Sequence, residues 1–323
     1  MVETADAAPT AGAMDARRAG ASRPRWYWHP YNRARLYRLA ERLARIPRPV
    51  RLPLARALGG LAPRFLPAER AAVQRALVRI TGARGARLDA LTADVFRAFA
   101  MCFSDLVSTN RQPVERLPRY LASVTGAEHV HALTGGVICL TAHVGNWELA
   151  GRLLAARSAR PTHVVVAPDA PELDRWVRRD GDGVRFVTRL QPAVGVELLA
   201  ALRRGEVVAL QGDRALGDRG DVWLPFFGEP APFPLGPFVL ARGAGVPVVA
   251  AFCVLDGRGR YHLRVAPPVT VTRGEEEAAA RTWVQRLEAV VREHPTQWFN
   301  FFDLWNPFVS PIGSPPAGAG ERA

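Results

Sequence analysis

A histidine and a glutamate five residues apart are the first residues in this sequence that could do acid–base chemistry. They are His143 and Glu148, and they follow the apolar run from Val137 to Ala142. On one continuous helix the two side chains would lie about 140° apart and could not meet. They can meet only if His143 lies in a strand-to-helix turn, and Gly145 with Asn146 supplies the residue types for that turn.

A carboxylate bonded to one imidazole nitrogen would fix the tautomer of His143 and make the other nitrogen more basic. The ring could then take a proton from a hydroxyl group, which would become the nucleophile without any covalent enzyme intermediate. The bare spacing H-x4-E is weak evidence, because it occurs by chance in many proteins and a purely structural histidine explains it equally well. Its position after a buried strand favours the catalytic interpretation.

A second cluster contains an acidic residue and a basic residue directly after another apolar run. Asp213 and Arg214 end the segment Q-G-D-R, which follows the run that begins at Val207. Arg214 could bind phosphate, polarise an acyl carbonyl or stabilise the oxyanion formed from it. A structural hydrogen-bond network between Asp213 and Arg214 is the competing explanation. The segment F-F-G-E-P-A-P-F, which contains Phe227 and Gly228, comes shortly afterwards.

The third cluster is aromatic. The segment H-P-T-Q-W-F-N-F-F-D-L-W at 294–305 includes Trp298 and places five aromatic residues within eight positions. Such a segment could form an apolar wall for a lipid chain, although an aromatic core stripe is the more common outcome.

The elements that must position these clusters alternate along the chain. Short apolar runs separated by helical segments predict an α/β domain with a central, mostly parallel or mixed sheet flanked by helices, and a site at the carboxyl ends of the strands. Basic amphipathic N-terminal helices are expected before it, with the clearest one at 33–46, and a second helical region at 88–109 carries an apolar stripe. The predicted strands are 137–142, 163–167, 184–188, 207–211, 246–254 and 261–265, and the predicted helices of the α/β part are 146–157, 171–180, 194–204, 236–244 and 275–293.

The positive charge of the chain is concentrated in one block. The net charge is +13, from 43 Arg and no Lys against 30 acidic residues. Residues 24–87 carry 15 Arg against only Glu41 and Glu69, whereas the rest of the chain is balanced. This pattern favours an anionic partner: nucleic acid, a membrane surface or an acidic carrier protein. The Leu and aromatic residues between the arginines favour the membrane over nucleic acid, and a solvated basic face without a partner is the plain alternative.

Several other classes of protein are poorly supported. The three cysteines are widely spaced, which argues against a zinc site or a disulfide framework. The first 23 residues lack the apolar segment of a signal peptide, and no run reaches the roughly 18 apolar residues of a bilayer-spanning helix. The motifs G-x-S-x-G, G-x-G-x-x-G after a strand, H-E-x-x-H and the P-loop are absent.

Taken together and in this order, the three clusters resemble the lipid A acyltransferase branch of the lysophospholipid acyltransferase superfamily. The resemblance covers about residues 30–308 and implies that His143 is the base, Glu148 its partner and Arg214 a contact to substrate or oxyanion. It implies a donor that is an acyl carrier protein thioester or acyl-CoA, with no metal and no other cofactor. The substrate-binding residues that we expect are Asn146, Asp213, Phe227, Gly228 and Trp298.

The resemblance implies an acyltransferase that moves a fatty acyl chain to a hydroxyl of a lipid or glycolipid. Lipid A-like acylation is the first expectation for the acceptor. Unlike the bacterial lipid A enzymes, the sequence shows no N-terminal hydrophobic span, so ornithine lipid, phosphatidylinositol mannoside and polyene acceptors stay open, as does a catalytically silent lipid-binding protein. We expect a peripheral protein on the cytoplasmic face of the bacterial inner membrane. The predicted regions are a disordered start at 1–23, a basic helical docking region at 24–110, the α/β core at 111–309 and a disordered tail at 310–323.

Overall fold

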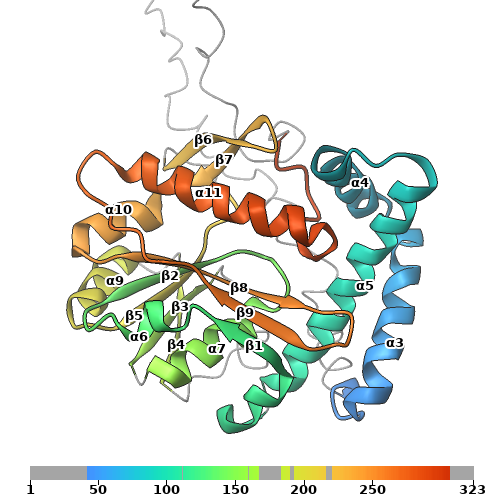
Figure 1. Cartoon of the computed structure of the whole chain (residues 1–323), viewed down its shortest axis with the longest axis horizontal. Helices are drawn as coiled ribbons and strands as arrows, with labels where there is room; N and C mark the ends of the chain where they lie inside the picture. The colour runs from blue at the N-terminus through green and yellow to red at the C-terminus, as the bar shows by residue number, and fades with distance from the viewer. Residues whose placement is uncertain are drawn as a thin grey trace, which may run out of the picture.

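The computed structural model describes residues 42–110, 112–158, 160–166, 183–189, 193–215 and 220–305. Both ends predicted as disordered and the helix predicted at 171–180 lie outside these residues, as does most of the helix predicted at 33–46. A central sheet with helices on both sides dominates the described part (Figure 1). The predicted α/β architecture with a mixed sheet is therefore confirmed.

The sheet has seven strands in the order β1-β9-β8-β2-β5-β3-β4. Neighbouring strands from β8 to β4 run parallel, whereas β9 is antiparallel to β8 and β1 is parallel to β9. The prediction found six of the seven strands within two residues of their ends and missed β1. The strands are β1 (Leu121–Thr125), β2 (Val137–Thr141), β3 (Thr162–Val166), β4 (Val184–Thr188), β5 (Val207–Gln211), β8 (Val248–Leu255) and β9 (Tyr261–Val265).

Two apolar cores lie on the two faces of this sheet. Strand β8 contributes to both, because its side chains alternate between the faces and all eight of its residues are buried. One core is covered by α9 (Val194–Arg203), α10 (Gly236–Ala244) and α11 (Glu276–Glu293). The other is covered by α7 (Trp147–Ser158) and α5 (Gly85–Thr109). The central strands are therefore held rigidly on both faces, which fixes the positions of the residues that follow them.

Three N-terminal helices lie together at one end of the sheet, on the right of Figure 1. They are α3 (Arg48–Leu61), α4 (Pro67–Thr81) and α5. Helices α3 and α4 were not predicted, because prolines interrupt their sequence patterns. Each helix has a proline in its first turn, where proline is well tolerated, and α3 also contains Pro53 in its interior. Helices α4 and α5 share one core with the sheet, so the predicted boundary at residue 110 does not separate two cores. Among the described residues, no helix is long and apolar enough to cross a membrane.

A two-stranded antiparallel hairpin, β6 (Asp221–Phe226) and β7 (Glu229–Pro234), was not predicted. Its four prolines obscure the strand pattern, since proline lacks the N–H that a ladder needs. Phe227 and Gly228 form the turn with φ angles of 52° and 82°, the left-handed backbone that a two-residue hairpin turn requires. Short connections, including η3 (Ala62–Arg64), η4 (Val114–Tyr120), α6 (Glu128–His131) and η5 (Pro295–Gln297), complete the described chain.

Candidate active site

Two neighbouring strands bring a histidine and an aspartate together. Thr141 at the end of β2 is paired with Gln211 at the end of β5. His143 and Asp213 each follow their strand by two residues, so the parallel register places them side by side at the carboxyl edge of the sheet. Nδ1 of His143 lies 2.8 Å from Oδ1 of Asp213.

A tight turn between β2 and α7 presents His143 at this edge. Gly145 has a φ of 58°, and a Cβ atom there would lie 2.0 Å from the carbonyl oxygen of Cys253 in β8. Only glycine fits this close approach. The backbone N–H of Asn146 donates to the same carbonyl at 2.8 Å, and the N–H of Phe299 donates to the carbonyl of His143 at 2.8 Å. The turn is thus held on both sides, as the sequence predicted for a strand-to-helix connection.

Asp213 is buried, with 1% of its surface exposed, and its two oxygens take part in three hydrogen bonds. Besides the His143 ring, Oδ2 accepts from the His143 backbone N–H at 3.0 Å and from Nε1 of Trp298 at 3.1 Å. Both side chains are buried and hydrogen-bonded to each other, and their predicted contacts with substrate stay predictions. Their geometry fixes the orientation of His143.

Burial, together with the positive charge of Arg214, favours the neutral form of the His143 ring. Burial lowers the pKa of His143 below its ordinary 6.5, the positive charge of Arg214 lowers it too, and Asp213 acts in the opposite direction. Burial alone would raise the pKa of Asp213, but its contact with His143 and the charge of Arg214 outweigh burial and lower that pKa to about 2. An ionised carboxylate only accepts hydrogen bonds, so Nδ1 of His143 carries the proton. The lone pair is then on Nε2.

Among the described residues, the hydrogen bond of the His143 ring involves Nδ1, so Nε2 is open, and the side chain is 12% exposed. A histidine with one nitrogen held by a buried carboxylate and the other open is the arrangement of a general base. The proton of an incoming hydroxyl group is the natural partner for this nitrogen.

Glu148 does not have the position that its spacing suggested. It lies in the first turn of α7 and accepts a hydrogen bond from Nδ2 of Asn110, at the end of α5, at 3.1 Å. The carboxylate on His143 is that of Asp213, so the predicted pairing of His143 with Glu148 is wrong. The sequence did contain an indication of the correct partner, because His143 and Asp213 each follow the start of a predicted strand by the same number of residues.

Arg214 is next to this pair, and its guanidinium contacts the segment after Trp298. Nη2 donates to the carbonyl of Phe299 at 3.2 Å, and the guanidinium carbon lies 5.4 Å from the ring centroid of Phe302. Burial lowers the pKa of Arg214 and Asp213 raises it, but an arginine stays cationic at neutral pH. A fixed positive charge therefore lies close to His143, and the predicted contact of Arg214 with substrate stays a prediction.

The other predicted substrate-binding residues have structural contacts. Oδ1 of Asn146 accepts from the backbone N–H of Leu149 at 3.1 Å and so caps α7. The backbone N–H of Phe227 donates to Glu288 of α11 at 2.8 Å, and Gly228 completes the hairpin turn. Contacts to substrate from these three residues stay predictions.

A series of aromatic side chains in contact with one another begins at His143. The ring of Trp147 lies 4.9 Å from that of His143 and 6.4 Å from that of Phe299. Phe99 of α5 packs on Phe299 at 5.3 Å and on Phe103 at 5.9 Å. Trp147, Phe99 and Phe103 are half-buried, so they give the site an apolar border. The sequence had placed such a border in 294–305, where Phe299 in fact belongs to the core.

Asn300 is a buried polar residue next to Phe299 that was not predicted to belong to the site. It is 3% exposed, and neither oxygen nor nitrogen of its amide bonds to a described residue. Burying an amide without hydrogen-bond partners is unfavourable, so the position of Asn300 calls for an explanation. In the described ranges, no three His, Cys, Asp or Glu side chains are grouped so that they could hold a metal ion.

Comparison with known proteins adds a family match. The family model described as bacterial lipid A biosynthesis acyltransferase matches residues 37–306. A phosphatidylinositol mannoside acyltransferase of Mycobacterium tuberculosis is 29% identical over 200 residues, covering 59% of this chain and 62% of that protein. A lipid A biosynthesis lauroyltransferase of Escherichia coli is 28% identical over 194 residues, covering 58% of this chain and 62% of that protein. The matches thus span less than two thirds of each relative.

Among solved structures, the 1-acyl-sn-glycerophosphate (LPA) acyltransferase PlsC of Thermotoga maritima aligns with a TM-score of 0.35 and 14% identity, over 76% of this chain and 97% of that one. A TM-score at that level is too low for positions in the two structures to be compared.

Proposed function

Because the chain belongs to the bacterial lipid A biosynthesis acyltransferase family, we propose that it transfers a fatty acyl chain from a thioester to a hydroxyl group of a lipid. The observation that carries this proposal is the hydrogen bond of His143 to buried Asp213, with Nε2 of His143 left open. This pair makes the ring a general base at neutral pH, and proton removal from a hydroxyl is the step that such a transfer needs.

The reaction would take place in two proton transfers. Nε2 of His143 takes the proton of the acceptor hydroxyl while the oxygen attacks the thioester carbonyl, and Asp213 stabilises the imidazolium that forms. The carbonyl oxygen becomes negative, and the cation of Arg214 is the nearby group that would stabilise it. The tetrahedral intermediate then expels the thiolate, which takes the proton from His143. An ester and a thiol result, and no covalent enzyme intermediate forms.

The donor is proposed to be an acyl carrier protein thioester or acyl-CoA, and the acceptor a glycolipid. Two relatives support the glycolipid, since their names specify a phosphatidylinositol mannoside and lipid A. A phosphatidylinositol lipid carries a phosphate, and an arginine beside the general base suits such an acceptor. Lipid A-like acylation remains our first assignment, with the mannoside as the nearest alternative. The protein would act peripherally at an anionic membrane, on the cytoplasmic face of the inner membrane.

Mass spectrometry of lipids tests this function. Cells without the protein should lack one acyl chain on a glycolipid, and the missing chain should return when the wild-type protein is expressed again. The purified protein should add the same chain to the extracted lipid when it is given acyl carrier protein or coenzyme A thioesters. If the lipid profiles of the two strains are identical and no thioester is consumed in vitro, the protein is not this acyltransferase.

Arg214 should be needed as an arginine. The change Arg214→Lys keeps the charge but loses the planar fork, so it should clearly reduce acyl transfer, and Arg214→Ala should reduce kcat/KM by about 10²- to 10³-fold if the oxyanion contact is lost. Initial rates of folded, purified variants measure this effect. Arg281, an exposed residue paired with Glu277 in α11, offers a matched control, and Arg281→Ala should have the wild-type rate. Wild-type rates for both Arg214 variants would leave Arg214 only a structural role.

The rate should depend on pH through His143. Burial and the charge of Arg214 lower the pKa of His143 below 6.5, so the base is available at pH 7 and is lost by protonation as the pH falls through that pKa. The logarithm of kcat/KM should be level from pH 7 to 8 and fall with a slope of about one at acid pH. A rate that still rises steeply above pH 7 would mean that another group is the base.

A further inference from the structure

Helix α3 carries an exposed apolar stripe. Five of the described large apolar residues that are exposed lie on α3 and the turn after it, whereas α9 and α10 carry one each. The five are Val50 at 60%, Leu54 at 40%, Leu58 at 54%, Leu61 at 44% and Phe65 at 78% exposure. At 3.6 residues per turn, the four on α3 fall within about 80° of one face. They form a continuous strip on the helix and are called the α3 stripe below.

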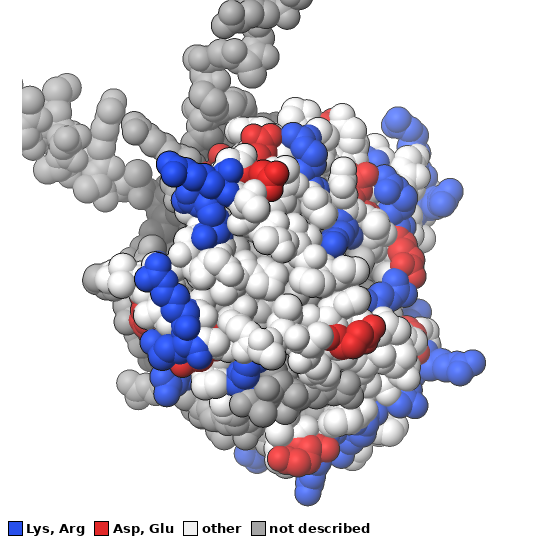
Figure 2. All heavy atoms as spheres, turned by 60° about the vertical axis from the view of Figure 1, so that its left-hand side comes forward, with Lys and Arg blue, Asp and Glu red and all other residues white. Residues whose placement is uncertain are grey.

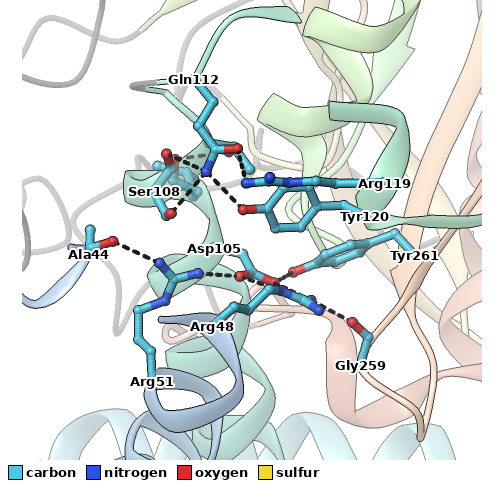
Figure 3. Close-up of polar contacts among 12 residues, drawn as sticks. Ala44, Arg48, Arg51, Asp105, Ser108, Gln112, Arg119, Tyr120, Gly259 and Tyr261 are labelled. Atoms are coloured by element: carbon cyan, nitrogen blue, oxygen red, sulfur yellow. Dashed lines mark hydrogen bonds and ion pairs between the residues drawn. The ribbon is translucent and has the colours of Figure 1, made fainter. Parts of the chain in front are cut away.

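The opposite face of α3 is fixed to the body of the protein. A Cβ atom on Gly59 would lie 2.7 Å from the carbonyl oxygen of Phe96, so α3 packs closely on α5. Arg48 and Arg51 turn inward to Asp105, which is fully buried, each with a contact of 2.7 Å (Figure 3). The hydroxyl of Tyr261 in β9 donates to the same carboxylate at 3.1 Å. These contacts hold α3 in one orientation and leave the α3 stripe facing outward.

Helix α3 and the segments directly before and after it carry arginines and no acidic residue. No acidic residue occurs between Glu41 and Glu69, and four arginines in this interval are exposed: Arg42, Arg45, Arg56 and Arg64. Apolar side chains flanked by arginines suit a surface that has an apolar interior and anionic headgroups. An acidic protein would match the arginines but would not require a strip of leucines facing outward.

We propose that the α3 stripe is the face by which this protein binds an anionic lipid bilayer. Arg48 also donates to the carbonyl of Gly259, in the turn after β8, so α3 lies at the end of the sheet toward which β8 runs. Strand β2 is parallel to β8 and leads to His143. Binding through the α3 stripe would therefore place the carboxyl edge of the sheet, and with it the candidate active site, toward the membrane. This inference deepens the proposed function, since a lipid acceptor lies in a bilayer.

The other side of the molecule is less suitable. Helices α9 and α10 lie on the left of Figure 1, the side that faces the viewer in Figure 2. There, arginines and acidic residues surround an uncharged centre. Val196 and Val239 are the large apolar residues exposed on these two helices. This face has neither a continuous apolar stripe nor charges of one sign. Its two exposed valines are therefore the matched control for the leucines of the α3 stripe.

Sedimentation of the full chain with lipid vesicles tests the proposal. The vesicles contain phosphatidylcholine with about one third phosphatidylglycerol, and the double variant Leu54→Ser/Leu58→Ser is compared with Val196→Ser/Val239→Ser. The α3 variant should bind roughly tenfold more weakly for each leucine replaced, because a leucine would no longer be buried in the bilayer, and the control should bind like the wild type. Replacing Arg56 and Arg64 by Gln should weaken binding about fivefold per arginine at low salt and little at high salt. Thermal unfolding verifies that each variant is folded.

Three results would overturn the proposal. The first is wild-type vesicle binding by both the leucine and the arginine variants, and the second is an equal loss in the control pair. The third is unchanged vesicle binding by the leucine variant together with weaker binding to a purified acidic acyl carrier protein, which would make the α3 stripe a protein-docking face. The readout is binding rather than acyl transfer, so a failure of the proposed function would leave this result unaffected.

Discussion

Replacing His143 by alanine should lower kcat/KM for acyl transfer by about 10²- to 10⁴-fold, the usual contribution of a positioned general base. In the imidazole ring of His143, Nδ1 is hydrogen-bonded to Asp213 and Nε2 is open. Without this ring, the acceptor hydroxyl has no base, although donor and acceptor can still bind. Initial rates with acyl carrier protein or coenzyme A thioesters measure the loss.

A second substitution separates chemistry from folding. His143→Ala leaves the buried Asp213 without one of its three hydrogen bonds and is expected to reduce stability as well. In His143→Asn, the amide nitrogen can take the place of Nδ1 and keep the bond to Asp213, yet no base remains. This variant should unfold at a temperature closer to that of the wild type and still be as inactive as His143→Ala. A wild-type rate for folded His143→Asn would remove His143 from the mechanism.

Asp213→Asn should have the second large effect, a loss of about 10²- to 10⁴-fold. An amide in this place can donate a hydrogen bond to Nδ1, which would move the ring proton to Nε2 and leave no lone pair facing the acceptor. In a Ser-His-Asp triad, the same change lowers kcat by about 10⁴-fold. Glu148→Gln should cost less, because Glu148 bonds to Asn110 and not to His143. The rates of the two folded variants are compared under identical conditions.

The pH profile distinguishes these two acids further. Asp213 raises the pKa of His143, so its removal should shift the acid limb of the rate profile to lower pH. Glu148 is not among the groups that shift this pKa, and Glu148→Gln should leave the limb in place. A shift in Glu148→Gln with none in Asp213→Asn would reverse the assignment of the partner.

The sequence was sufficient for the elements whose apolar pattern is regular. Strands β4, β5 and β9 and helix α10 have the predicted bounds, because buried parallel strands and amphipathic helices leave clear patterns. The hairpin β6–β7 and helix α3 were missed because their prolines break those patterns. In both cases tertiary contacts overcome the local preference: hairpin pairing for β6–β7 and packing on α5 for α3.

The site was predicted only in part for a similar reason. The position of His143 follows from a local sequence, a buried strand with a glycine turn after it. Its partner is 70 positions away and depends on which strands are neighbours and in what register, which one sequence does not reveal. Glu148 is near His143 in sequence, but helix α7 directs its carboxylate to Asn110. The burial of the Asn300 amide and the exposure of the α3 stripe likewise depend on how distant segments pack together, so the sequence alone did not predict them.

The most direct test of the account is a double-mutant cycle of acyl transfer that uses His143→Ala, Asp213→Ala and the variant with both changes. All four folded proteins are assayed with the same thioester donor and lipid acceptor. If Asp213 acts only through His143, the double variant should be little slower than His143→Ala alone, because residues that act as a unit are not additive. Losses that multiply in the double variant would show that the two residues act independently, and would contradict a base formed by His143 and Asp213.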